Sequence, residues 1–87
     1  MSKKTLLKSF VDKAYEDEDQ IWLATSAGVF RGKISEKPET LDSMDQVTLS
    51  SVTLFSGGKR LEFTESYILI ENVVAFGYGV NFKGSRG

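Results

Sequence analysis

The chain has 87 residues, 40% of them hydrophobic, and its 11 basic and 12 acidic side chains leave a net charge of −1. A chain of this length builds one hydrophobic core, which excludes a second domain with a core of its own. The absence of cysteine and histidine excludes disulfides and thiolate metal sites, and it removes the commonest general base and metal ligand. Dedicated nucleic-acid proteins usually carry a basic excess, so a nucleic-acid site here has to be local or lie where symmetric copies converge.

The sequence also bounds location and chemistry. No segment approaches the roughly 20 apolar residues that cross a bilayer, and residues 1–4 lead into an amphipathic pattern rather than the apolar core of a signal peptide. We therefore expect a cytoplasmic protein without membrane association. The serines have no histidine or cysteine partner, and the acids of residues 36–45 lie in a predicted solvated loop. We therefore expect no enzyme activity, no catalytic residue, no metal and no cofactor.

Residues 3–15 are predicted to form an amphipathic helix. Apolar side chains recur there at helical spacing, at Leu6, Leu7, Phe10, Val11 and Ala14, with Tyr15 beside them. Ser2 is the expected N-cap. The acids of residues 16–19 oppose the helix macrodipole at a C-terminus, so we expect them to end the helix as a solvated turn.

A first hairpin is predicted next. Residues 20–25 and 29–35 read as two strands joined by the turn Ser26-Ala27-Gly28. Gly28 and Gly32 are costly in a strand-like sequence, because glycine has no side chain to pack and loses the most backbone freedom. They are favourable where a strand bends sharply or another backbone comes close. This pattern indicates a small, strongly curved sheet.

Residues 36–46 contain the single proline and four acids and are predicted to form a loop. Residues 47–56 and 60–65 then read as a second hairpin around Gly57-Gly58. Two short apolar strands, residues 67–70 and 73–76, follow on either side of Glu71-Asn72. We expect a single domain over residues 1–80 and a flexible tail over residues 81–87.

The order and spacing of these elements resemble the Sm/Lsm family. The match to its first motif consists of Leu23, Gly28, Phe30, Arg31, Gly32, Lys33 and Ile34. Residues 47–54 are similar to the family's third strand, and residues 67–74 to its second motif. The resemblance implies a mainly β fold, the Sm-like small β-barrel, in which an N-terminal α-helix accompanies a five-stranded, strongly bent antiparallel sheet.

The resemblance also implies a homo-oligomeric ring, a hexamer or a heptamer. In such a ring the fourth strand, near residues 59–65, pairs with the last strand, near residues 73–78, of a neighbour. Closure covers both sheet edges, which otherwise invite pairing with other chains. The oligomer-interface candidates are Leu61, Phe63, Val74, Phe76 and Tyr78.

In the family, the loop before the third strand holds an RNA base with an acid, a stacking residue and an asparagine. The corresponding loop here is longer, and the RNA-binding candidates that the resemblance implies are Asp42, Met44, Asp45, Gln46 and Asn72. Asp42 or Asp45 takes the place of the acid and Gln46 that of the amide. Glu71-Asn72 stands where the family has a basic residue and glycine, and a carboxylate there repels phosphates.

Two functions follow from this comparison. The first is a ring that binds or scaffolds single-stranded RNA through an altered base pocket. The second is a non-catalytic protein-interaction or structural ring that kept the Sm architecture and lost RNA binding. The acidic balance, Glu71 and the lack of a basic patch favour the second function, whereas the family favours the first.

Several side chains outside these motifs have two interpretations. Trp22 lies in an Ile-Trp-Leu run, which favours a core or interface anchor over a base-stacking platform. Arg31 and Lys33 alternate with apolar residues, which favours the solvent face of a strand over a phosphate contact. Lys59 and Arg60 follow a Gly-Gly turn, where a basic tip serves either RNA or solubility.

Overall fold

The structure is a computed structural model that describes residues 2–79, so the predicted tail over residues 81–87 lies outside the described residues. Its elements are α1 (Lys3–Asp17), β1 (Gln20–Thr25), β2 (Gly28–Ile34), β3 (Gln46–Ser56), β4 (Lys59–Leu69), the 3-10 turn η1 (Ile70–Asn72) and β5 (Ala75–Tyr78). The strands form one antiparallel sheet in the order β4-β3-β2-β1-β5. The predicted fold class, a helix with a strongly bent five-stranded sheet, is confirmed. The sheet is open, and β4 and β5 are its two edges.

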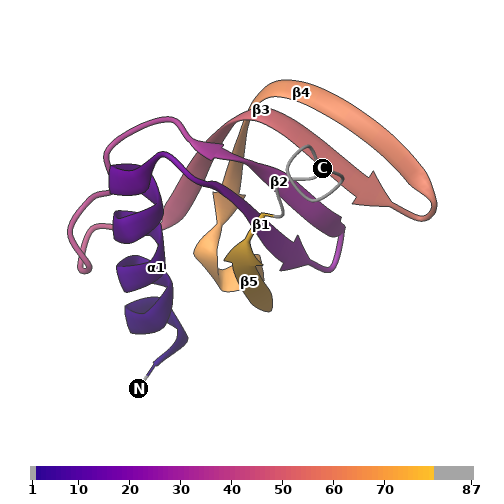
Figure 1. The fold of residues 1–87 in the computed structure, drawn as a ribbon. Coiled ribbons are helices and arrows are strands. Elements are labelled where there is room, and N and C mark those ends of the chain that lie inside the picture. Colours follow the sequence, from indigo (N-terminus) through magenta and orange to yellow (C-terminus); the bar gives the residue numbers. More distant parts are fainter. Residues whose placement is uncertain (1, 80–87) are drawn as a thin grey trace.

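Figure 1 shows α1 on one side of the sheet and the β3–β4 hairpin extending away on the other. The helix buries Leu7, Val11 and Ala14 against the sheet. The remaining core comes from the strands, the loop before β3 and η1, namely Ile21, Leu23, Met44, Val47, Leu49, Val52, Ile68, Ile70 and Val73. Within residues 2–79, no helix is long and apolar enough to cross a membrane.

The N-cap prediction for α1 is confirmed, because the Ser2 hydroxyl accepts a hydrogen bond from the Thr5 amide (3.2 Å). The helix runs further than predicted, through Glu16 to Asp17. An i,i+4 ion pair between Lys13 and Asp17 (3.1 Å) offsets part of the unfavourable charge in the last turn. Glu18 then ends the helix with a left-handed backbone, φ 56°.

The bend in the sheet lies where the pairing of β2 with β3 is irregular. The pairing of the two strands shifts register between Arg31 and Lys33, and Ser51 on β3 has a left-handed φ of 53°. This bulge reverses the alternation of side chains, so Leu49 and Val52 are both buried. Gly32 is required for the close approach, since a Cβ atom there would lie 2.8 Å from the Ser50 carbonyl oxygen.

The predicted break after residue 65 is wrong. β4 continues to Leu69 and pairs with β3 along its whole length, with Thr48 opposite Tyr67 and Gln46 opposite Leu69. Gln46 therefore belongs to β3 and not to the preceding loop. Residues 73 and 74 are not part of a strand, and β5 begins at Ala75. The length of β4 follows from its partner, because β3 is long enough to pair with the β4 backbone groups that face it from Lys59 to Leu69.

Candidate functional site

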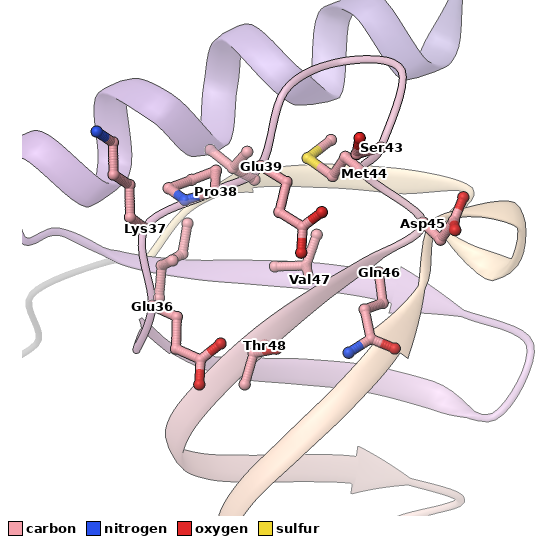
Figure 2. A pocket seen from close by; sticks show the side chains of 12 residues that line it. Glu36, Lys37, Pro38, Glu39, Ser43, Met44, Asp45, Gln46, Val47 and Thr48 are labelled. Atoms are coloured by element: carbon pink, nitrogen blue, oxygen red, sulfur yellow. The ribbon is translucent and has the colours of Figure 1, made fainter.

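The loop of residues 35–45 connects β2 to β3. A pocket of about 320 Å³ lies between this loop, α1 and the start of β3 (Figure 2). Three of the five predicted RNA-binding residues line this pocket, Met44, Asp45 and Gln46. Backbone hydrogen bonds hold both ends of the loop. The Ser35 amide donates to the Thr48 carbonyl (3.1 Å), and the Met44 amide donates to the Thr40 carbonyl (2.9 Å), closing one helical turn.

Met44 is a core residue. Its side chain is only 3% exposed and packs with the buried apolar side chains of the helix and sheet. A side chain in that position fixes the loop to the core, and stacking a base on it would first require pulling it out. The exposed apolar side chain of this loop is Leu41, which sequence reasoning did not single out.

The pocket is acidic. Its lining includes three carboxylates, Glu36, Glu39 and Asp45, against one ammonium, that of Lys37. Figure 2 shows Glu36 and Glu39 reaching toward the start of β3, whereas the Lys37 ammonium points away toward the helix. Carboxylates in this arrangement attract cations and repel the phosphates of RNA.

The same negative field extends to the neighbouring edge strand. The Tyr67 hydroxyl donates a hydrogen bond to Glu65 Oε1 (2.8 Å). This bond raises the pKa of Tyr67, the charge of Glu65 raises it further, and Glu36 acts in the same direction from the loop. Glu36 of the loop and Glu65 of β4 therefore both contribute negative charge at Tyr67.

Asn72 and Glu71 lie in η1 and are both exposed. The Ile70 amide donates to the Asp45 carbonyl (2.9 Å), which joins the turn to the end of the loop. Asn72 nevertheless lines a different hollow, together with Thr25 and Ser26 of the first hairpin. Of the predicted RNA-binding set, the structure thus groups Met44, Asp45 and Gln46, whereas Asn72 lies apart. Asp42 is exposed on the turn of the loop.

Two lysines at the start of α1 also belong to this region, and the sequence analysis did not single them out. Lys3 Nζ donates to the Val73 carbonyl (2.9 Å) and therefore holds the end of η1. Lys4 lines a small hollow with Asp45 and Glu71. Their positions beside Val73, Asp45 and Glu71 depend on residues far away in the chain, for which the local sequence carries no signal.

The second candidate region consists of the two sheet edges. On β4, Leu61 and Phe63 are 47% and 42% exposed, and their register partners Leu54 and Val52 lie on β3. Directly opposed residues share a face of the sheet, and Val52 is buried in the core. Leu61 and Phe63 therefore extend the core face to the open edge.

The β5 edge has the same character. Tyr78 and Phe76 pair with the buried residues Ile21 and Leu23 of β1, so they too lie on the core face. Their rings stand 4.7 Å and 4.9 Å from the ring of Phe10 on α1. Phe76 is half-buried by this contact, whereas Val74, just before β5, is largely exposed. Both edges of the open sheet thus end in apolar side chains on one continuous face.

No family model matches the chain, and no curated protein matches it either. Solved structures do match. A heptameric archaeal Sm protein covers 83% of this chain and 98% of its own, with a TM-score of 0.64 and 11% identity. The Pyrococcus abyssii Sm protein, solved in complex with a uridine heptamer, covers 82% of this chain and 94% of its own, with a TM-score of 0.62 and 16% identity.

The P. aerophilum SmAP1 heptamer covers 86% of this chain and 95% of its own, with a TM-score of 0.66 and 12% identity. At identities this low, the likeness establishes the fold. The chain has an Sm-like fold, as the sequence resemblance implied.

Proposed function

We propose that this Sm-fold protein assembles into a homo-oligomeric ring, a hexamer or heptamer, by pairing β4 of one copy with β5 of the next, and that the ring binds single-stranded RNA. The observation that carries the proposal is the pair of open edges, each ending in apolar side chains on the core face. Two different edges that meet head to tail form a heterologous contact, and such contacts close into rings when the rotation allows.

The energetics favour closure. An unpaired strand edge leaves backbone donors and acceptors for another strand. Covering a half-exposed leucine or phenylalanine fully contributes on the order of 1 kcal/mol, since complete burial is worth about 1.5–3 kcal/mol. A small domain has little stability to spare. Leu61 and Phe63 on one copy and Tyr78 and Val74 on the next supply this gain at every interface.

RNA binding is supported by the fold and by the uridine complex of one structural neighbour. The base site in this protein differs from the one that the resemblance implied. Met44 is buried, Asn72 faces a separate hollow, and the loop pocket is acidic. RNA that enters this pocket must present a base edge there and keep its phosphates outside, because carboxylates accept hydrogen bonds from base amino groups but repel phosphates.

A fluorescence titration with labelled oligo-U and oligo-A at low salt tests this function. We expect dissociation constants below about 10 μM that rise steeply with salt, because phosphate neutralisation supplies much of such affinity. No binding of either oligonucleotide at low salt would contradict the RNA-binding part of the proposal. The oligomeric state, measured on the same sample by light scattering, tests the ring separately.

The second candidate function is a protein-interaction ring without RNA. The acidic lining of the loop pocket and Glu71 beside Asp45 favour it, because a ring repeats each of these charges in every copy. A partner for such a surface carries basic side chains. A ring mass together with no RNA binding at low salt is the result that selects this function.

A further inference from the structure

The outward face of the sheet, opposite the core, carries a groove of about 650 Å³. Trp22 of β1 lines this groove, with Gly77 of β5 as its partner on one side and Arg31 of β2 on the other. Thr53 of β3 continues the same row, opposite Arg31. The neighbours of Trp22 in the chain, Ile21 and Leu23, are buried in the core. Trp22 therefore faces outward and is not a core anchor.

Two aromatic side chains border the groove. The Trp22 indole lies against the β5 backbone, since a Cβ atom on Gly77 would come within 2.7 Å of the ring. This close packing fixes the indole in place. Phe55 of β3 is 41% exposed and lies opposite Val29, one step further along the sheet. Fixed, accessible rings on a sheet surface are platforms on which the bases of a single strand stack.

The charged side chains that line this groove are basic, whereas most of those that line the loop pocket are acidic. Among the described residues that line the groove are two arginines, Arg31 and Arg60, and no carboxylate. Arg60 lies opposite Phe55, and its guanidinium pairs with Glu62 (3.0 Å) at a site where both side chains are exposed. Exposed ion pairs of this kind are weak, so a phosphate can replace the carboxylate.

We propose that single-stranded RNA binds in this outer groove, with bases stacked on Trp22 and Phe55 and phosphates beside Arg31 and Arg60. The inference rests on the proposed RNA-binding function and names its site. It follows from charge: the groove combines aromatic rings with cations, whereas the loop pocket presents three carboxylates to any phosphate. A closed ring presents one such groove per copy.

Trp22 is the single tryptophan of the chain, so its fluorescence reports on the groove directly. The experiment titrates the full-length protein with an unlabelled oligo-A and an oligo-U at low salt and follows tryptophan emission. Stacking of a base on the indole quenches it. We expect saturable quenching with the same midpoint as the binding curve of a labelled oligonucleotide, and both midpoints shift together when salt is added.

Two substitutions in the groove and two matched controls complete the test. Arg60→Gln and Phe55→Ser change exposed side chains, and we expect each to weaken binding by about 3- to 30-fold, with a smaller salt slope for Arg60→Gln only. Lys13→Gln removes one positive charge from an exposed ion pair on α1, and Tyr67→Ser removes an exposed aromatic ring outside the groove. We expect both controls to bind RNA within about 2-fold of the unaltered protein, since neither side chain lines the groove.

The outcomes are distinguishable. RNA binding without quenching, and with affinity unchanged in Arg60→Gln and Phe55→Ser, would overturn the groove site while leaving the proposed RNA function intact. No RNA binding at all would overturn both. Emission that changes with protein concentration and not with RNA would mean that a second copy covers the groove, which also overturns the proposal.

Discussion

At the scale of single residues, Gly32 is the position where the fold has the least tolerance. A Cβ atom there would meet the Ser50 carbonyl oxygen at 2.8 Å, and backbone at the centre of a sheet moves little. We expect Gly32→Ala to lower the free energy of unfolding by about 1–3 kcal/mol. Urea unfolding followed by circular dichroism measures this loss.

Thr64→Ala, an exposed position on β4, is the control for that experiment, and we expect a change within about 0.5 kcal/mol. A Gly32→Ala protein as stable as the parent would show that β2 and β3 are further apart at the bend than the structure has them.

Tyr67 provides a residue-scale prediction in pH. Its hydrogen bond to Glu65 and the charge of that carboxylate raise its pKa above the usual 10.0. The folded state therefore favours the neutral phenol, and this contribution to stability is present below pH 10 and lost as the pH rises through the folded pKa. In an ultraviolet titration of the protein, we expect the Tyr67 phenol to ionise above its usual pKa of 10.0.

Glu65→Gln removes the charge and should bring the Tyr67 pKa back toward its usual value. Late ionisation that persists in Glu65→Gln would assign the effect to another group.

Individual residues were also where prediction from sequence was least complete. The close approach at Gly32 is predictable from the sequence, because a glycine inside a strand indicates a sharp bend or a nearby backbone. The place of Met44 in the loop before β3 implies, by the family resemblance, a role in the RNA site, yet the Met44 side chain is buried. An apolar residue in a loop is either exposed or buried, and only its packing in the folded chain decides which. The apolar neighbours of Trp22 favour a core or an interface position. Strand alternation turns its side chain away from the core, and the interface position stays a prediction.

At the scale of elements, the bulge at Ser51 produces the bend. Its left-handed backbone, φ 53°, is strained for a residue with a Cβ atom and relaxed for glycine. We expect Ser51→Gly to raise the free energy of unfolding by about 0.5–1 kcal/mol after the entropic cost of glycine is subtracted. Thermal and urea unfolding measure the gain.

Ser50→Gly is the matched control, one residue away with ordinary strand geometry. We expect it to lose about 0.5–1 kcal/mol. Equal effects of the two substitutions would mean that the bulge is not centred on Ser51.

The elements themselves were largely predictable, and their ends were not. The helix stripe, the N-cap and the two hairpin turns each have a local signal, and all were located correctly. The extent of β4 has no such signal, because it depends on how far β3 runs beside it, and the sequence of residues 65–70 reads equally well as a break between two short strands. The end of α1 is also hard to predict, because the Lys13–Asp17 ion pair offsets part of the negative charge that was expected to end the helix at residue 15.

At the scale of the whole molecule, the two open edges of the sheet determine how copies of the protein can associate. Phe63 lies on the core face of β4 and Tyr67 on the opposite face, and both are exposed in a single copy. We expect Phe63→Ser to shift the assembly toward smaller species, because it removes an apolar side chain from every interface. Tyr67→Ser should leave the assembly unchanged. Analytical ultracentrifugation over a range of concentrations compares the two variants.

The same shift in both variants would place the contact on the other face of β4. Circular dichroism of each variant shows whether the single copy remains folded, so a loss of assembly is not confused with a loss of structure.

The most direct test of the ring is the mass of the unaltered protein in solution, measured by light scattering after size-exclusion chromatography. We expect one species of six or seven chains of 9.7 kDa each, with a mass that does not change on dilution. A monomer at high protein concentration would contradict this expectation.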